Sequence, residues 1–370
     1  MNNASLTEKI QAFNPSLPLE QAHTIPACWY RDADLYEAER STVFSGSWLA
    51  VGRREEVASA GSYLTIDVAG EPILVVRDEQ GVLRAFSNVC RHRAALVMTE
   101  PCGHATRLRC RYHGWTYDLA GRLRGTPEFD GVADFRREEQ GLVALHVAEW
   151  GPLVWVHAGE SAPPLDDYLD PLSRLIACLG TDRLRFVERR SYDLACNWKV
   201  FVDNYLDGGY HVNTVHPGLA GVLDYSRYRT EIGRFASVQI SPLDTAGASQ
   251  TVGKVREGEN AYYAWVFPNL MVNVYHGYMD TNLVLPLGPT HCRVVYDFYF
   301  DAGRDAEHIA GSIAVAHQIQ LEDGDICEEV QRGLASRTYK AGRYSARREG
   351  PVYAFHQLLA HCLRERLSAP

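Results

Sequence analysis

Hydrophobic and polar positions divide the chain into a β-rich first half and a mixed second half. From Gly61 onward, short alternating segments such as YLTIDVAG, PILVVRD and VLRAFSNV are separated by glycines and charged residues. Alternation with a period of two predicts half-buried strands, so we expect small antiparallel β-structure that continues through LVALHVAEW and PLVWVHAG. Residues 161–164, SAPP, are typical of a linker and predict where the two halves meet.

The second half mixes helical and strand patterns. Its apolar periodicity predicts a helix near 166–179, strands near 185–195, 229–240, 262–276, 281–287 and 291–300, and helices near 304–335 and 351–365. Before the β-rich half, residues 34–53 (DLYEAERSTVFSGSWLAVGR) predict a helical stretch that buries Leu35, Phe44 and Trp48. The sequence therefore predicts an α+β chain with a helical segment at 1–45 that packs on the last domain, a β domain at 46–160 and a larger domain at 161–370.

Composition and charge narrow the class of protein. The chain has 370 residues, of which 46% are hydrophobic and 22% charged, which is ordinary for a globular protein with two domains. A net charge of −9 argues against nucleic acid or an anionic membrane as a partner. No apolar run approaches the roughly 18 to 20 residues of a membrane span, and the first residues resemble no targeting signal. Nine scattered cysteines fit a reducing compartment, so we expect a cytoplasmic protein.

The sharpest motif lies in the β-rich half. Cys90-Arg91-His92 is followed, after seventeen residues, by Cys110-Arg111-Tyr112-His113, so each half of the motif offers one thiolate and one imidazole. A [2Fe–2S] cluster with two cysteines on one iron and two histidines on the other requires this alternation. The alternative is a structural zinc site, but such sites usually keep ligands of one kind together. The mixed pairs between strands favour the iron–sulfur interpretation.

A second set of possible ligands lies in the other half. Asn197 can cap a helix that begins at Trp198, and two consecutive glycines then break the pattern before His211 and His216. Histidines five apart on an unbroken helix would diverge, whereas a break lets both imidazoles turn towards one point. Asp323, in QLEDGDICEEVQRG, is the candidate third ligand. Two histidines and one carboxylate on one face of a metal suit non-haem Fe(II) that also binds O2.

These motifs carry a family resemblance. The two Cys–His pairs followed by Gly-Trp, together with NWKVFVDNYLDGGYHVNTVH and LEDGDICEEVQRGL, resemble the oxygenase components (alpha subunits) of Rieske non-haem iron oxygenases. DNYLDGGYH, MDTNLVLPLGP and EEVQRGLAS are similar to the choline monooxygenases and related quaternary-amine monooxygenases. The resemblance implies an all-β Rieske [2Fe–2S] domain followed by a helix-grip-like catalytic domain with an antiparallel sheet and helices.

The resemblance also implies roles for particular residues. The cluster ligands would be Cys90, His92, Cys110 and His113, and the ligands of mononuclear Fe(II) would be His211, His216 and Asp323. Asp207 would link a cluster histidine of a neighbouring subunit to an iron-ligand histidine, which implies a homotrimer. Most members of the family have this acid three residues before the first histidine, whereas Asp207 lies four before His211. In the first cluster loop, Arg91 and Ala94 replace the usual loop-shaping residues.

The substrate pocket is predicted from an aromatic strand pattern. Tyr263, Trp265 and Phe267 alternate and so share one strand face, and with Tyr275 and Tyr278 they could hold a trimethylammonium group by cation–π attraction. The alternative is that this face is plain hydrophobic core. Asn204, about one turn before Asp207, either hydrogen-bonds near the iron or lies on the helix surface.

The expected reaction inserts one atom of O2 into a C–H bond of a small quaternary amine. Choline is the first choice of substrate, with the aldehyde hydrate as product, and an N-methyl compound would instead lose formaldehyde. Because the chain has no dinucleotide-binding glycine motif and no second ferredoxin pattern, its electrons would come from a separate NAD(P)H-dependent reductase or a ferredoxin. Two alternatives are an aromatic-ring hydroxylating or demethylating oxygenase, and a non-catalytic electron carrier, against which the second ligand set argues.

Overall fold

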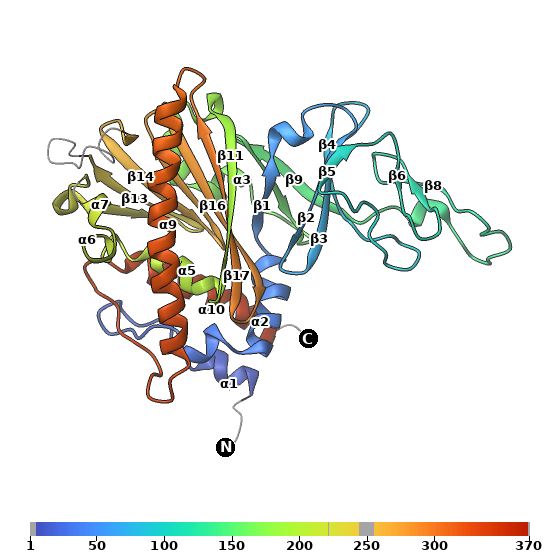
Figure 1. Ribbon diagram of the computed structural model, residues 1–370. Helices are drawn as coiled ribbons and strands as arrows, with labels where there is room; N and C mark the ends of the chain where they lie inside the picture. The colour runs from blue at the N-terminus through green and yellow to red at the C-terminus, as the bar shows by residue number, and fades with distance from the viewer. Residues whose placement is uncertain (1–4, 221, 244–254, 369–370) are drawn as a thin grey trace. The chain divides into compact units, whose positions relative to one another are not determined.

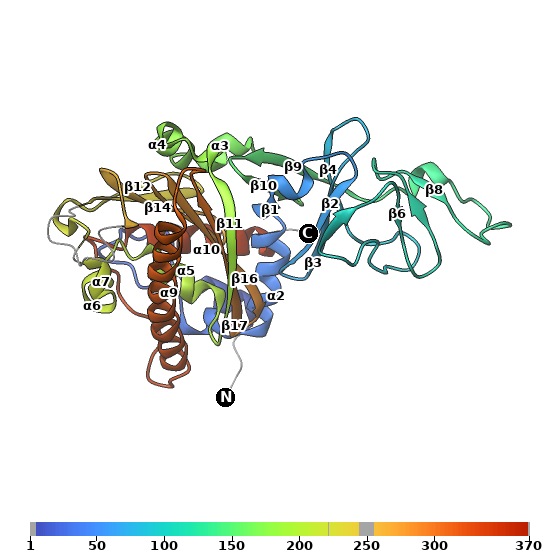
Figure 2. The same cartoon turned by 45° about the horizontal axis from the view of Figure 1, so that its top comes forward.

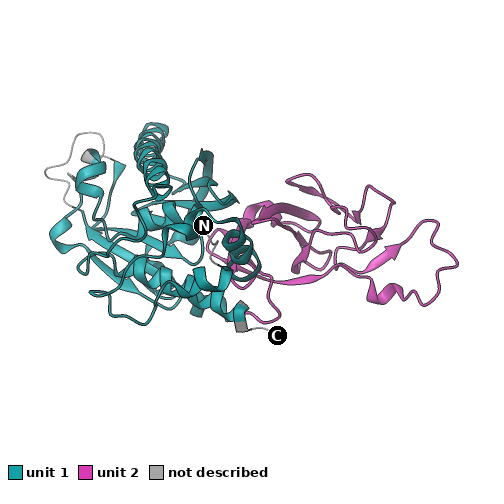
Figure 3. Ribbon diagram, turned by 90° about the horizontal axis from the view of Figure 1, so that it is seen from below, with its two compact units in different colours: residues 1–44, 163–370 teal, residues 45–162 magenta. Residues whose placement is uncertain are grey.

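The chain folds as two compact units, which Figure 3 distinguishes by colour. The computed structural model describes residues 5–220, 222–243 and 255–368. Unit 1 combines Met1–Phe44 with Pro163–Pro370, and unit 2 is Ser45–Ala162. The boundary between the units therefore falls within the SAPP segment. Among the helices in the described part of the chain, none has both the length and the apolar character needed to cross a bilayer.

Unit 2 is built from strands, as its alternating pattern predicts. Its larger sheet has the order β1-β10-β9-β4-β3-β2-β5, and a smaller sheet has the order β6-β7-β8. The strands are β1 (Trp48–Arg53), β2 (Ser62–Val68), β3 (Glu71–Arg77), β4 (Leu83–Ser87), β5 (Cys102–His104), β6 (Leu108–Arg109), β7 (Thr116–Tyr117), β8 (Leu123–Gly125), β9 (Ala144–Trp150) and β10 (Leu153–His157).

The N-terminal helical stretch is shorter than the sequence pattern predicts. It consists of α2 (Ala33–Glu39) and a π-helical turn, η2 (Arg40–Phe44), and the prediction that the helical pattern extends through residues 45–53 is wrong. Ser45, Gly46 and Ser47 interrupt the helix, and the next residues form β1, which pairs antiparallel with β10. Four consecutive buried residues, Trp48 to Val51, fit a strand that is covered on both faces.

Unit 1 contains one antiparallel sheet with the order β11-β17-β16-β15-β14-β13-β12. Its strands are β11 (Arg185–Leu194), β12 (Arg229–Ile232), β13 (Ala236–Pro242), β14 (Asn260–Val266), β15 (Leu270–Tyr275), β16 (Tyr278–Gly288) and β17 (His291–Phe300). Two predicted strands, 229–240 and 262–276, are each a pair of strands in the structure. A turn whose Gly233 N–H donates to the Ala236 carbonyl divides the first pair, and Pro268 lies in the turn that divides the second.

Helices cover one face of this sheet (Figures 1 and 2). In the described residues of unit 1 the helices are α1 (Leu6–Gln11), η1 (Ala27–Tyr30), α2, η2, α3 (Leu165–Leu169), α4 (Leu172–Ile176), η5 (Ala177–Leu179), η6 (Thr181–Arg183), α5 (Trp198–Leu206), α6 (Val212–Val215), α7 (Pro217–Ala220), η7 (Tyr225–Arg227), α9 (Ala306–Leu334) and α10 (Gly350–Ser368). Helix α5 packs between the sheet and α9. The single helix predicted near 166–179 is wrong, because Pro171 separates α3 from α4.

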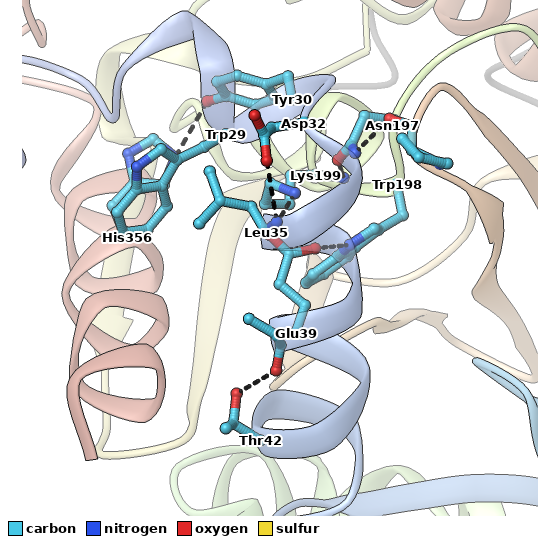
Figure 4. A network of polar contacts seen from close by, with 12 residues as sticks. Trp29, Tyr30, Asp32, Leu35, Glu39, Thr42, Asn197, Trp198, Lys199 and His356 are labelled. Carbon is cyan, nitrogen blue, oxygen red and sulfur yellow. Dashed lines mark hydrogen bonds and ion pairs between the residues drawn. The ribbon is translucent and has the colours of Figure 1, made fainter. Parts of the chain in front are cut away.

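A buried polar network ties the N-terminal segment to α5 (Figure 4). Glu39 accepts hydrogen bonds from Lys199 Nζ at 2.6 Å and from Trp198 Nε1 at 2.9 Å, and the Glu39 and Lys199 side chains are fully buried. Asn197 caps α5 by accepting from the Lys199 backbone N–H, which confirms the predicted cap. Breaking a buried ion pair by removing one partner costs about 3–5 kcal/mol, so this network fixes the start of the helix that leads to Asp207.

Candidate functional site

Two glycines set the path of the chain between α5 and α6. Gly208 and Gly209 both have a φ of +72°, a conformation that side-chain-bearing residues rarely adopt. A Cβ on Gly208 would lie 2.3 Å from the backbone oxygen of Arg348, so only glycine fits there. The predicted helix break is confirmed, and it places His211 directly before the short helix α6 and His216 directly after it.

His211, His216 and Asp323 bring one ligand atom each to a common point. The two Nε2 atoms lie 3.1 Å apart, His216 Nε2 lies 3.1 Å from Asp323 Oδ1, and His211 Nε2 lies 3.7 Å from the same oxygen. Two ligands at right angles and about 2.1 Å from one metal would be about 3 Å apart. These separations therefore fit one divalent ion held on a single face, with the opposite face left open.

Carboxylates orient both imidazoles from behind. His211 Nδ1 donates to Asp207 Oδ2 at 2.7 Å, and His216 Nδ1 donates to Glu322 Oε2 at 2.7 Å. Asn204 Nδ2 donates to Asp323 Oδ1 at 2.6 Å, so its amide lies at the ligand cluster rather than on the helix surface. With Nδ1 protonated in both rings, each Nε2 keeps its lone pair for a metal. The donor set thus fits the expected iron.

Glu322 belongs to the site although no sequence pattern indicated it. Adjacent helical residues point about 100° apart, so nothing in the local pattern indicates that Glu322 faces His216 while Asp323 faces both histidines. The acidic residues after Asp323 have other surroundings. Glu328 accepts a hydrogen bond from the backbone N–H of Ala195 at 2.9 Å, and Asp325 is exposed.

A cavity of about 90 Å³ opens onto the three ligands. Tyr263 and Tyr275 both line it, and their hydroxyl oxygens lie 2.7 Å apart. Trp265 and Phe267 do not, which corrects the predicted pocket. Their rings lie 5.3 and 6.3 Å from the ring of Phe355 on α10, which covers that part of the sheet. Phe267 also lies beyond the end of β14, where strand alternation no longer applies.

Other residues of the cavity came from no sequence pattern. Tyr228, Arg256 and Asp280 line it, as do Asn273 and Asn282. Asn273 and Asp280 face each other across the paired strands β15 and β16, and Asn282 follows on β16, whereas Tyr228 and Arg256 come from the segments before β12 and β14. Tyr278 is fully buried beside them and contacts Arg256 with its ring.

In unit 2, the two Cys–His loops have the same backbone hydrogen bonds. The Cys90 N–H donates to the carbonyl five residues later at 2.8 Å, and the Cys110 N–H does the same at 2.9 Å. The fourth residue after each cysteine, Ala94 or Gly114, donates back to that cysteine's carbonyl. Both of these residues have positive φ, 54° and 73° respectively. Ala94 therefore occupies a left-handed position that favours glycine.

The side chains of these loops are arranged as a cluster of mixed ligands requires. The Cys90 and Cys110 side chains are buried, whereas His113 is exposed and His92 is partly so. The two imidazole centroids lie 4.7 Å apart, and the His92 ring stacks on Trp115. Tyr117 Oη lies 3.4 Å from Cys90 Sγ. Inner thiolates and outer imidazoles fit a [2Fe–2S] cluster with one cysteine-bound and one histidine-bound iron.

Comparison with known proteins agrees with both sites. Residues 47–136 match the Rieske [2Fe-2S] domain family, and residues 181–365 match the family of ring hydroxylating alpha subunits (catalytic domain). Choline monooxygenase, chloroplastic, from Arabidopsis thaliana is 39% identical over 98% of this chain and 88% of its own length. The carnitine monooxygenase oxygenase subunit of Escherichia coli K12 is 31% identical over 94% of this chain and 95% of its own.

Solved structures give the same relationship. The crystal structure of the quaternary ammonium Rieske monooxygenase CntA in complex with L-carnitine superposes with a TM-score of 0.80 and 28% identity, over 98% of this chain and 99% of that one. Naphthalene 1,2-dioxygenase shares the fold at a TM-score of 0.76 with 18% identity. This chain therefore belongs to the Rieske non-haem iron oxygenases, as an alpha subunit whose cofactors are a Rieske [2Fe–2S] cluster and mononuclear iron.

Proposed function

We propose that this enzyme uses O2 and external electrons to hydroxylate a small quaternary ammonium compound. The observation that carries the proposal is the tyrosine-lined cavity that opens onto His211, His216 and Asp323. The names of the relatives support it, because choline and carnitine both carry a trimethylammonium group. Choline, oxidised at its alcohol carbon to betaine aldehyde hydrate, is the substrate that the sequence resemblance favours.

In this mechanism the histidines and Asp323 hold iron, and Cys90, His92, Cys110 and His113 hold the cluster. Iron bound there supplies O2 activation, so that C–H, O2, two electrons and two protons give C–OH and water. Asp207 and Glu322 hold the Nδ1 protons of the two histidines, which keeps both rings in one tautomer and orientation. Asn204 restrains Asp323 Oδ1 through its amide N–H, so the carboxylate keeps one orientation.

Substrate binding follows from the ring faces of the cavity. A trimethylammonium ion is weakly hydrated, and each tyrosine face that it contacts contributes about 0.5–2 kcal/mol by cation–π attraction. Tyr263 and Tyr275 are locked to each other through their hydroxyl groups, and Tyr205 is held by its hydroxyl to the Ala264 carbonyl at 3.0 Å. These rings are therefore preorganised, and binding would cost little side-chain entropy.

Electrons are supplied by a separate reductase or ferredoxin in this proposal. His113 is exposed, which gives an outer edge of the cluster site that another protein or subunit can approach. Asp207 is the residue that would connect His211 to the cluster histidine of a neighbouring subunit. A head-to-tail contact of this kind can close into a ring, and the family resemblance implies that this ring is a homotrimer.

The test is oxygen uptake by the purified enzyme with a competent reductase and a panel of compounds. Choline, trimethylglycine and L-carnitine represent quaternary amines, and benzoate represents simple aromatic acids. The proposal predicts that a quaternary amine stimulates uptake and is consumed, and that Asp323→Ala abolishes both. Asp325→Ala, which changes an exposed carboxylate of the same helix, is the matched control. Uptake and conversion with benzoate, and with no quaternary amine, would overturn the proposal.

A further inference from the structure

Arg256 is a buried cation in the wall of the cavity. Arg256 is 2% exposed, and it lines the same cavity as His211, His216 and Asp323. Its guanidinium carbon lies 4.7 Å from the ring centroid of Tyr275 and 4.8 Å from that of Tyr278. The two rings hold the guanidinium group in place through cation–π contacts.

Two of the three guanidinium nitrogens of Arg256 have no hydrogen-bond partner among the described residues. These are Nε and Nη1, which are buried and belong to a side chain that is charged. Buried polar groups in native proteins nearly always have partners, and a buried charge is usually paired. Ring faces attract the positive charge, but they are weak acceptors for N–H groups. Nε and Nη1 are therefore available to an acceptor that occupies the cavity.

Asp280 is the anionic counterpart in this cavity, and its own oxygens are occupied. Tyr278 Oη donates to Oδ2 at 2.5 Å, and Asn273 and Asn282 donate to Oδ1 at 2.7 and 2.9 Å. Burial raises the pKa of Asp280, while these donors and Arg256 act in the opposite direction. Three donors and no acceptor match the ionised carboxylate, which has no proton to donate.

The cavity thus carries one fixed positive and one fixed negative group in addition to the metal ligands. We infer that the substrate is a zwitterion, a quaternary ammonium carboxylate, whose carboxylate pairs with Arg256 and whose ammonium group lies among Asp280 and the tyrosine rings. The inference rests on the proposed function and sharpens its substrate class. The planar fork of a guanidinium group matches the two oxygens of a carboxylate, which gives the pairing both strength and direction.

A simple cation such as choline fits this wall less well. It would add a second positive group to a cavity in which Arg256 stays unpaired, and its hydroxyl offers one weak acceptor in place of two charged oxygens. An acid without the ammonium group would pair with Arg256 but leave Asp280 and the ring faces without a cation. Each half of the zwitterion therefore has its own partner in the wall.

Four compounds of nearly the same shape separate these contributions in the wild-type holoenzyme. Trimethylglycine carries both charges, choline only the cation, 3,3-dimethylbutanoate only the anion, and 3,3-dimethylbutanol neither. Binding is measured by calorimetry without reductant, so no turnover is needed. We expect trimethylglycine to bind at least about tenfold more tightly than choline or 3,3-dimethylbutanoate, the ratio that one modest charged contact provides.

Variants of Arg256 test the same pairing from the protein side. Arg256→Met should weaken trimethylglycine binding about a hundredfold, the scale for removing one partner of a buried charged pair, and should leave choline binding unchanged or tighter. Arg256→Lys should recover part of the loss. Arg293→Met is the matched control, because Arg293 is an exposed arginine that pairs with Asp193 on the same sheet. The cluster absorbance verifies that each variant is folded.

The outcomes separate the two proposals. Choline binding as tightly as trimethylglycine in the wild type, or an unchanged preference in Arg256→Met, would overturn the zwitterion inference and leave a quaternary amine oxygenase. If both quaternary compounds bind no better than 3,3-dimethylbutanol, the inference and the proposed function both fail. The four-ligand comparison uses the wild type, so it tests the inference even if the Arg256 variants do not fold.

Discussion

The imidazole of His216 donates from Nδ1 to Glu322 Oε2 at 2.7 Å. His211 repeats this arrangement with Asp207, so each histidine of the ligand cluster has a carboxylate behind it and a free Nε2 in front. Glu322 precedes Asp323 on α9, and one turn of helix therefore supplies both a ligand atom and the support for another ligand.

Replacing Glu322 by Ala should lower iron affinity about 10- to 100-fold, the usual effect of removing a residue that orients a metal ligand. Glu322→Gln keeps an oxygen acceptor and should lose less. The measurement is the mononuclear iron that remains after dialysis against graded chelator. The exposed Asp325 provides the control, and equal iron retention in Glu322→Ala and Asp325→Ala would contradict the support role.

The metal ligands could be predicted from sequence because cofactor chemistry restricts both residue type and spacing. The mixed Cys–His pairs and the glycine break before His211 are local patterns, and the structure brings their side chains together. Arg256 and Glu322 could not be predicted in this way. Arg256 comes from a segment outside the strands whose path no local pattern indicates, and Glu322 differs from its acidic neighbours only in the direction in which the helix points it.

Trp265 shows the limit of the strand argument. Alternation correctly places it on the same face as Tyr263, but a face of a long sheet can lie partly in a cavity and partly beneath a helix. Phe355 of α10 covers Trp265, and no periodicity within β14 contains that information. The prediction of strand ends was wrong at Gly233 and Pro268, where a turn joins β12 to β13 and β14 to β15. Both apolar patterns continue across these turns, so periodicity alone does not mark them.

Replacing Ala94 by glycine should make the folded protein slightly more stable. Its φ of 54° is left-handed, and Gly114 occupies the equivalent place in the other cluster loop. Ala94→Gly relieves this strain but increases the flexibility of the unfolded chain, so we expect a net gain of about 1 kcal/mol or less. Ala94→Val should be destabilising. The measurement is the urea concentration at which half of the cluster colour is lost. Equal midpoints for the wild type and both variants would contradict the strain at Ala94.

Tyr117→Phe should lower the reduction potential of the cluster. Tyr117 Oη lies 3.4 Å from Cys90 Sγ, and a hydrogen bond to a ligand sulfur stabilises the more negative, reduced cluster. Its loss corresponds to about 0.5–1.5 kcal/mol, or on the order of tens of millivolts for one electron. A spectroelectrochemical titration measures the shift. Tyr63→Phe changes a buried tyrosine of the same core and serves as control, and equal potentials in all three proteins would refute the contact.

Asp207→Asn should keep both metals and lose nearly all coupled turnover. The amide retains an oxygen for His211 but cannot carry the charge that the proposed link between subunits needs. Stopped-flow oxidation of the reduced cluster, in the presence of substrate and O2, reports on this step directly. A strictly monomeric preparation, verified by ultracentrifugation, that turns over at the full rate with its reductase would exclude a role between subunits.

The most direct test of the two metal sites is the iron and acid-labile sulfide content of three proteins. The wild type should contain about three iron and two sulfide per chain. Asp323→Ala should keep the cluster colour, two iron and two sulfide while losing turnover, and His113→Ala should bleach the cluster. Zinc in place of iron without labile sulfide, or a His113→Ala protein with an intact cluster, would contradict the assignment of these residues.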